Sequence, residues 1–428
     1  MSIAAVALSC ALLIVVASLF NGFIDAFERS AADTLGDIVL LPPVKFGGYA
    51  KLIERLEGLG AVEAATATLP AQGLLHLGRG DVRAVAIWGI EVQKFGKVTA
   101  FERSLLNKGR DRIKQADGEI EGGSATLTTG YVSIGVLAEP DEKTDEYDFN
   151  AVAQKIGQEA VLTTGSAVEQ KEGSQQFRRK TIRLEIRDVV FTGVYSLDRQ
   201  VVYVPIEQLC EVIYPESREV AERIQIKLKS GSDEAVALAQ IRGVWETFAA
   251  EKLGWEPYQI QRTQIETARQ MQARYVAEIR KQMGVLLLIF GVVSLSSVLL
   301  IFCIFYMIVE TRRKDVAIVK SCGAGSGAVA LIFVGFGGCI GVIGTAVGTV
   351  LGYFITKNIN AIEGWIRVIF GLKLWKASVY IFSRIPNEVD WQAVVWIVLS
   401  AIAGAALGAL IPAVSAAITR PVNVLRYE

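Results

Sequence analysis

The residues in this sequence best suited to specific ion pairing lie in one short segment, VETRRKDVAIVKSCGAG, at positions 309–325. The runs on either side, residues 282–309 and 321–356, contain no Asp, Glu, Lys or Arg. Arginine and aspartate form ion pairs of defined geometry, and the VAIV stretch after the aspartate adds apolar contact. We interpret the segment as a short helix that docks on another protein; the alternative is an ordinary charged loop.

Few other residues could carry catalytic or metal chemistry. His76 is the only histidine, which excludes a His-based triad or cluster, and the five cysteines show no CxxC spacing. A G-x-x-x-x-G-K-[ST] phosphate loop is absent as well, so the sequence predicts no ATP hydrolysis by this chain. We therefore expect a non-catalytic chain that binds no cofactor or metal of its own.

The apolar residues are concentrated in a few long runs. The chain is 52% hydrophobic, has a mean hydropathy of +0.38 and carries no net charge. Four runs lack charged residues: 1–24, 282–309, 321–356 and 391–419. Each is longer than the roughly 20 residues that cross a bilayer as a helix. The sequence predicts an integral membrane α-helical protein with four transmembrane helices and one large extracytoplasmic α+β domain.

The first apolar run could in principle be a cleaved signal peptide. It has no basic residues before it and no clear A-x-A site, and the faint lipobox likeness at Cys10 lacks flanking Lys or Arg. We expect a retained transmembrane helix over residues 1–24.

The large domain is predicted over residues 25–262, with strands and helices in alternation. A β-α-β unit is expected near its start and a second near its end, with a polar hairpin tip between them. Residues 111–150 look like an insertion with weak local order. The basic residues at the hairpin tip are read as a solvated edge strand, without nucleic-acid binding. The expected elements are strands 38–41, 61–68, 180–195, 223–228 and 257–261, helices 49–58 and 233–250, and the hairpin tip 169–180.

Two further segments connect this domain to the apolar runs. Residues 263–281 are amphipathic and predict a stalk helix that enters the second span at 282–309. Such a helix either transmits motion or merely tethers the domain. Residues 357–390 are rich in aromatic side chains and predict an interfacial loop on one membrane face.

The last two spans, 326–356 and 391–419, carry small residues at helical spacing, which allows close helix packing. We expect these two spans to pack against each other within one chain; a dimer seam is the alternative. Neither span contains an ionisable residue, which argues against an ion channel or a proton-coupled transporter. The predicted packing residues are Gly337, Gly341, Gly344, Gly348, Gly352, Gly404 and Gly408.

Basic residues bear on orientation through the positive-inside rule. They are dense in the short segment 310–325 and sparser along the longer loop 357–390. The density favours a cytoplasmic position for 310–325 and for the tail at 420–428.

The charged segment also carries a family resemblance. It resembles the coupling-helix motif of the FtsX/MacB/Lol class of ABC transporter permeases, at Arg313, Asp315, Val316, Ala317, Ile318, Lys320, Gly323 and Ala324. The ending IPAVSAAITRPVNVLRYE resembles the closing motif of that class, and the layout of one span, a large domain and three spans is similar. The segment IPNEVDW at 385–391 is similar to the corresponding segment of the lipoprotein-releasing LolC/LolE branch.

The resemblance implies a bacterial inner-membrane protein with a MacB-like periplasmic domain. It also implies a separate cytoplasmic ABC ATPase that uses the ATP, and a second permease copy or paralogue. A lipoprotein substrate and a periplasmic carrier are implied for the Lol branch, with membrane lipid around the spans. The implied ATPase-coupling residues are Glu310, Arg312, Arg313, Asp315, Val316, Ala317, Lys320, Gly323 and Ala324.

Two departures from the family pattern stand out. The chain lacks the basic amphipathic segment that usually precedes the first span, which suggests a shortened start, and the insertion at 111–150 does not align.

The expected function is extraction of lipoproteins from the inner membrane, driven by the ATPase. The alternatives are a MacB-like efflux component and an FtsX-like subunit that transmits ATPase state to a cell-wall hydrolase; an intramembrane enzyme is a poorer one.

Overall fold

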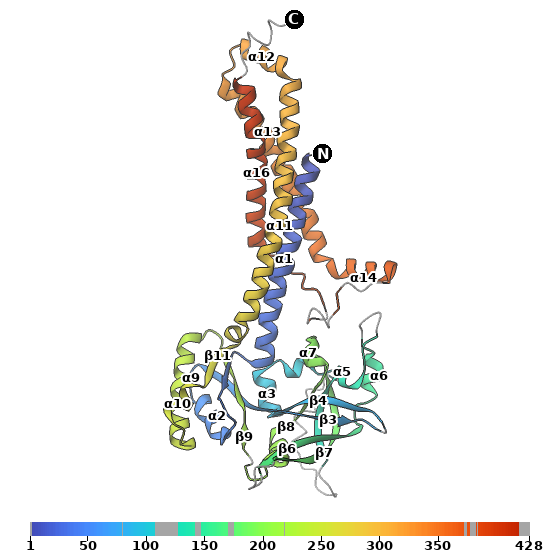
Figure 1. The fold of residues 1–428 in the computed structure, drawn as a ribbon, viewed down its shortest axis with the longest axis vertical. Coiled ribbons are helices and arrows are strands. Elements are labelled where there is room, and N and C mark those ends of the chain that lie inside the picture. The colour runs from blue at the N-terminus through green and yellow to red at the C-terminus, as the bar shows by residue number, and fades with distance from the viewer. Residues whose placement is uncertain are drawn as a thin grey trace. The chain divides into compact units, whose positions relative to one another are not determined.

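The structure is a computed structural model of the chain. It describes residues 2–78, 80–107, 127–141, 147–169, 175–217, 219–371, 375, 376, 382 and 384–418. The chain divides into two compact units (Figure 1). The helical unit comprises residues 1–26, 275–369 and 385–428, and the sheet unit comprises residues 27–274 and 370–384.

The sheet unit contains one large mixed sheet and a small two-stranded one. The large sheet has the order β11-β1-β10-β3-β4-β8-β5-β7-β6, and β3 also pairs with β6. Most pairings are antiparallel, but β8 runs parallel to β4 and β7 runs parallel to β5. The strands are β1 (Ile38–Leu41), β3 (Val62–His76), β4 (Val82–Ile90), β5 (Thr128–Ser133), β6 (Glu159–Glu169), β7 (Gln175–Val190), β8 (Val201–Pro205), β10 (Arg223–Leu228) and β11 (Gln264–Thr267), with β2 (Phe46–Gly47) and β9 (Val220–Ala221) forming the small sheet.

Amphipathic helices bury their apolar sides in the core of the sheet unit. In α2 (Tyr49–Glu57) the buried residues are Tyr49, Leu52, Ile53 and Leu56, at the spacing of one helix face. Helix α9 (Glu234–Phe248) begins after Asp233, whose carboxylate accepts the backbone N–H groups of the first turn. The other helices of this unit are α3 (Val92–Val98), η1 (Phe101–Ser104), α5 (Ile134–Leu137), α6 (Phe149–Ala153), α7 (Tyr195–Asp198), α8 (Ile206–Ile213), η2 (Ala249–Leu253) and α10 (Pro257–Gln261).

The two predicted β-α-β units have different outcomes. The first is confirmed as β1, α2 and β3, whereas the second is wrong in its last element because residues 257–261 form helix α10. Pro257 occupies the first turn of α10, and Glu256 and Gln259 form a capping box, both of which favour a helix start. The returning strand is β11, which pairs antiparallel with β1.

The predicted insertion at 111–150 also needs correction. Its residues Thr128–Ser133 form β5, which lies between β8 and β7 inside the large sheet. Residues 108–126 and 142–146 lie outside the described residues. The predicted hairpin is present as β6 and β7, which pair antiparallel up to Glu169 and Gln175, and its tip at 170–174 is outside the described residues.

The four predicted spans are confirmed as helices long and apolar enough to cross a membrane, over Ser2–Leu35, Tyr275–Thr311, Ser326–Lys357 and Trp391–Ile418. The stalk helix, predicted from residue 263, begins instead at Ala268, because the four residues before it form β11. Thr267 and Gln270 then cap the helix by reciprocal side-chain to backbone hydrogen bonds. The helices are α1 (Ser2–Leu35), α11 (Ala268–Thr311), α12 (Arg313–Ser321), α13 (Ser326–Lys357), α14 (Ile359–Phe370) and α16 (Trp391–Ile418).

Candidate functional site

The charged segment forms the short helix α12 between two membrane helices. Helix α11 ends at Thr311, and the non-helical backbone conformation of Arg312 separates α11 from α12. After α12, Gly323 has φ +103°, a left-handed conformation that favours glycine. Helix α13 then starts after Gly325. The backbone therefore isolates α12 as a separate short helix at the end of the helical unit.

Two ion pairs lie on the outer side of this turn. Arg313 Nη1 is 3.0 Å from Glu310 Oε1, and Arg312 Nη1 is 3.1 Å from Asp315 Oδ2. The four side chains are between 47% and 68% exposed. Exposed pairs of this kind stabilise a fold by about 0–1 kcal/mol. Their main effect here is to fix the positions of the positive and negative side chains on the surface.

The inner side of α12 is apolar. Ala317 is fully buried, and Val316 packs in a cluster with Val309 of α11, Val329 of α13 and Ala416 of α16. Val316 and Ala317 therefore hold α12 against the ends of three membrane helices. The sequence analysis assigned these two residues to apolar contact with a partner, but here they are buried within the chain.

Lys320 is also directed into the chain. Its Nζ donates a hydrogen bond to the carbonyl oxygen of Ala417, near the end of α16, at 2.6 Å. A cation at a helix C-terminus satisfies a terminal carbonyl and complements the helix dipole. Gly323 and Ala324 close the turn by backbone hydrogen bonds to Lys320 O and Val319 O. These three predicted coupling residues therefore shape and anchor the turn.

The remaining side chains form one exposed surface of mixed charge and apolar character. Ile318 and Val319 are 52% and 48% exposed, next to the two ion pairs. We call this set the α12 surface: Glu310, Arg312, Arg313, Asp315, Ile318 and Val319. Exposed apolar side chains together with charged ones are a common composition of a protein-binding surface.

The predicted glycine packing is partly different in the structure. Gly337 and Gly341 lie against Ala405 of α16, as expected for contact between the last two spans. The other glycines of α13 lie instead against α1. A Cβ built on Gly348 would be 2.6 Å from the carbonyl oxygen of Ala7, and Gly344 and Gly352 make similar close contacts with Val6 and Ile14.

The two glycines of α16 have another partner again. Gly404 and Gly408 both lie against Val298 of α11, where a Cβ on Gly408 would be 2.9 Å from the Val298 carbonyl oxygen. The prediction that all seven glycines serve one α13–α16 contact is therefore wrong. The small residues of α13 and α16 create three separate close contacts and join all four membrane helices.

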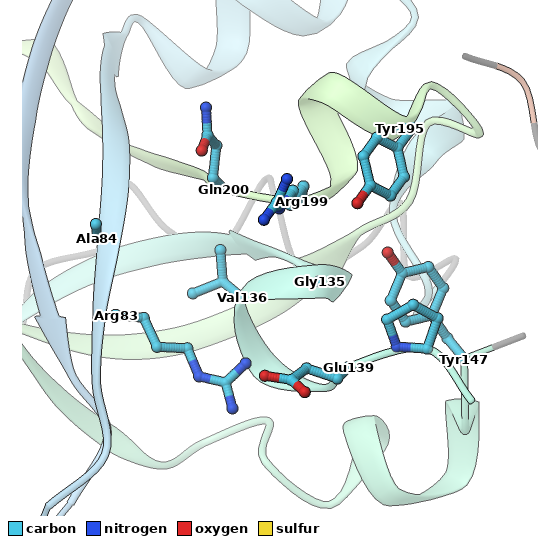
Figure 2. A pocket seen from close by; sticks show the side chains of 10 residues that line it. Arg83, Ala84, Gly135, Val136, Glu139, Tyr147, Tyr195, Arg199 and Gln200 are labelled. Carbon is cyan, nitrogen blue, oxygen red and sulfur yellow. The ribbon is translucent and has the colours of Figure 1, made fainter. Parts of the chain in front are cut away.

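A second candidate site is a cavity of about 400 Å³ in the sheet unit (Figure 2). Arg83 and Arg199 both line it, with Tyr147, Tyr195 and Glu139. Arg83 Nε already donates to Asp81 Oδ1 at 3.0 Å, and the Arg199 guanidinium lies 5.8 Å from the Tyr195 ring centroid. Both arginines therefore have a partner within the sheet unit.

A buried carboxylate fixes one wall of this cavity. Asp198 accepts hydrogen bonds from the Thr192 backbone N–H and hydroxyl and from the Gly193 N–H, at 2.7–2.8 Å. Burial raises the pKa of Asp198 to about 6, although these hydrogen bonds act in the opposite direction. The sequence interpretation missed Asp198, since nothing in its local pattern distinguishes it from an exposed acid. These hydrogen bonds fix the end of α7 against residues 192 and 193, and Tyr195 and the adjacent Arg199 are positioned with it.

Comparison with known proteins supports the predicted resemblance. Residues 287–421 match the family model described as FtsX-like permease C-terminal. The chain is 25% identical to the lipoprotein-releasing system transmembrane protein LolC of Neisseria meningitidis over 100% of this chain and 93% of that protein. It is 34% identical to LolC of Xylella fastidiosa and 31% identical to LolE of Haemophilus influenzae, but each match covers 28% of this chain and only 30% and 29% of the relative.

Solved structures similar to this chain cover about half of it. The periplasmic region of MacB from Actinobacillus actinomycetemcomitans matches 58% of this chain and 94% of that chain, at 13% identity and a TM-score of 0.35. The extracellular domain of the ABC-type transporter YknZ from Gram-positive bacteria matches 54% and 98%, at 12% identity and a TM-score of 0.29.

The resemblance to permeases of the FtsX/MacB/Lol type is confirmed by these matches. Residues 287–421 thus resemble the FtsX-like permease C-terminal domain, and the whole chain is similar to LolC; it has four helices long and apolar enough to cross a membrane and a large sheet-rich domain. Permeases of this type are generally non-catalytic subunits. The contact between the α12 surface and an ATPase stays a prediction.

Proposed function

We propose that this chain is the inner-membrane permease subunit that couples cytoplasmic ATP hydrolysis to the release of lipoproteins. The similarity to LolC over the whole chain supports this cargo, at 25% identity. The proposed partners are a cytoplasmic ABC ATPase at the α12 surface, a second permease copy or paralogue, and a periplasmic lipoprotein carrier. ATP would be bound by the ATPase, and the large domain would lie in the periplasm.

An external energy source is needed for this reaction. Each CH₂ group that leaves the bilayer costs about 0.8 kcal/mol, so extraction of one long acyl chain costs on the order of 10 kcal/mol. This chain has no phosphate loop to supply that energy. The energy would therefore enter through contact with the ATPase.

The observation that carries the proposal is the apolar cluster beneath the α12 surface. Val316 lies in one apolar cluster with residues from α11, α13 and α16, so a displacement of α12 would act on the ends of these three membrane helices. The interior of a packed cluster has low compressibility and transmits such a displacement. Helix α11 then continues without interruption from Thr311 back to Ala268. An ATPase that moves α12 would thereby move the long helix α11.

The proposal is tested by a double substitution on the α12 surface, Arg313→Ala with Asp315→Ala. The control is Glu278→Ala with Lys281→Ala, which likewise removes one exposed carboxylate and one exposed cation, here from an ion pair of α11. ATP-dependent release of lipoproteins from inner-membrane vesicles is measured together with ATP hydrolysis. We expect release to fall by about tenfold or more in the α12 variant, because charged contacts at an interface couple strongly. The control should release lipoproteins like the unmodified protein.

The outcomes separate the candidate functions. Unchanged release in the α12 variant would contradict coupling through this surface. If the unmodified protein retains an ATPase but releases no lipoprotein, the cargo is wrong, and efflux or mechanical signalling becomes the better assignment.

A further inference from the structure

Helix α14 has an apolar side that is left exposed by the residues that the structure describes. It starts at Ile359, directly after α13 ends at Lys357, and turns away from the line of α13 (Figure 1). Trp365, Val368 and Ile369 are 74%, 81% and 71% exposed. They occur at helical spacing on one side of the helix.

The charged residues of α14 lie on its more covered side. Glu363 and Arg367 are both only partly exposed, whereas Trp365, Val368 and Ile369 are exposed. A helix on a water-facing surface shows the opposite arrangement, with its charges outward and its apolar side buried. The outward face of α14 is therefore suited to an apolar surrounding.

The residues around the start of α14 mark the edge of the membrane. Tyr353 near the end of α13 packs against Trp391 at the start of α16, with ring centroids 5.9 Å apart. Lys357 Nζ lies 5.5 Å from the centroid of the Tyr353 ring. Aromatic and basic side chains gather at the boundary between acyl chains and water. Helix α14 begins at this boundary, since only Asn358 separates it from Lys357.

Hydrogen bonds hold the start of α14 at this level. Asn360 Nδ2 donates to the Ile385 carbonyl oxygen at 2.9 Å, and the Ile385 N–H donates to Asn360 Oδ1 at 3.0 Å. Asn387 Nδ2 donates to the Lys357 carbonyl oxygen at 3.1 Å. Both ends of the connection from α13 to α16 are thus joined just before α16 enters the membrane.

We propose that α14 lies in the membrane surface on the side of the large domain, with Trp365, Val368 and Ile369 inserted at the headgroup–acyl boundary. The occupant of its apolar side is lipid, and the lipid-facing surface of the neighbouring membrane helices continues onto it. This proposal rests on the membrane helices alone and requires neither an ATPase nor a lipoprotein cargo. The helix would fix the depth at which α13 ends and enlarge the part of this leaflet that the permease contacts.

The test places a polarity-sensitive NBD fluorophore on introduced cysteines. The full chain, with its native cysteines replaced, is reconstituted in phosphatidylethanolamine–phosphatidylglycerol nanodiscs with and without nitroxide lipids. The test position is Val368→Cys. Ile366→Cys on the more covered side of α14 is the control on the same helix, and Lys51→Cys at an exposed position of α2 is the water-facing control.

We expect the fluorophore at position 368 to lose about half of its emission to a nitroxide near the headgroups, and less to one near the acyl chain ends. The label at 366 should be quenched less, and the label at 51 should not be quenched. Quenching at 368 no greater than at 51 would overturn the proposal. A blue-shifted label at 368 without lipid quenching would overturn it too, since a protein neighbour would then cover this face.

Discussion

Helices α12 and α14 flank the two ends of α13, and they expose opposite kinds of surface. Helix α12 turns its apolar residues Val316 and Ala317 inward and presents ion pairs outward. Helix α14 presents Trp365 and Val368 outward and keeps its charged residues more covered. Two short helices in the same unit thus face different surroundings. The comparison indicates a watery or protein-facing environment for α12 and a lipid environment for α14.

The largest effect is expected from a charge on the buried side of α12. Val316→Asp places a carboxylate in the cluster of Val309, Val329 and Ala416, and we expect the free energy of unfolding to fall by about 3 kcal/mol. Val319→Asp, on the exposed side, should cost less than about 0.5 kcal/mol. Thermal unfolding in detergent micelles measures both. Equal losses would mean that α12 has no distinct inner side.

The next effect concerns α13, which joins the two short helices. Gly348→Leu should lower the free energy of unfolding by about 2 kcal/mol, because the side chain would collide with the backbone of α1 at Ala7. Gly338→Leu is the matched control, since a Cβ there meets no atom within 4 Å. Detergent unfolding midpoints that shift equally in the two variants would show that α13 does not pack on α1 through its glycines.

A smaller effect is expected at the start of α14. Asn360→Ala removes both hydrogen bonds to Ile385, which should cost about 1–2 kcal/mol and loosen the helix from its level in the membrane. Nitroxide quenching of a label at position 368 should then become less selective for shallow lipid positions. An unchanged depth profile would show that lipid contact alone holds α14 in place.

The smallest effect is expected at the end of α12. Lys320→Met keeps the aliphatic stem but removes the hydrogen bond to Ala417, and the unfolding free energy should fall by about 1 kcal/mol. Lys320→Arg retains a donor and should recover part of the loss in the same detergent unfolding assay. A loss of stability with methionine that arginine does not reduce at all would contradict the capping role of Lys320.

Local composition predicted the membrane helices and the short helix α12 well, but it predicted a loop where Ile359–Phe370 form helix α14. The spans follow from runs without charge, and α12 follows from the charged break between two such runs. These signals are local because the bilayer acts on each helix as a uniform apolar solvent. The LolC-type resemblance was likewise carried by short motifs.

Contacts between distant residues could not be predicted in the same way. The glycines of α13 are alike in sequence, yet Gly337 faces α16 and Gly348 faces α1, because partner choice depends on how four helices pack together. The bond from Lys320 to Ala417 joins residues far apart in the chain. Residues 257–261 were predicted as a strand, although Pro257 is a local signal for the start of a helix.

The most direct test of the central claim, that the α12 surface binds a cytoplasmic ATPase, is purification from native membranes in mild detergent with mass-spectrometric identification of the retained proteins. The unmodified chain is compared with the Arg313→Ala/Asp315→Ala variant and the Glu278→Ala/Lys281→Ala control. We predict that an ABC ATPase stays with the unmodified chain and the control and is lost from the α12 variant. An ATPase retained equally by all three, or absent from the unmodified chain when other membrane complexes survive, would contradict the claim.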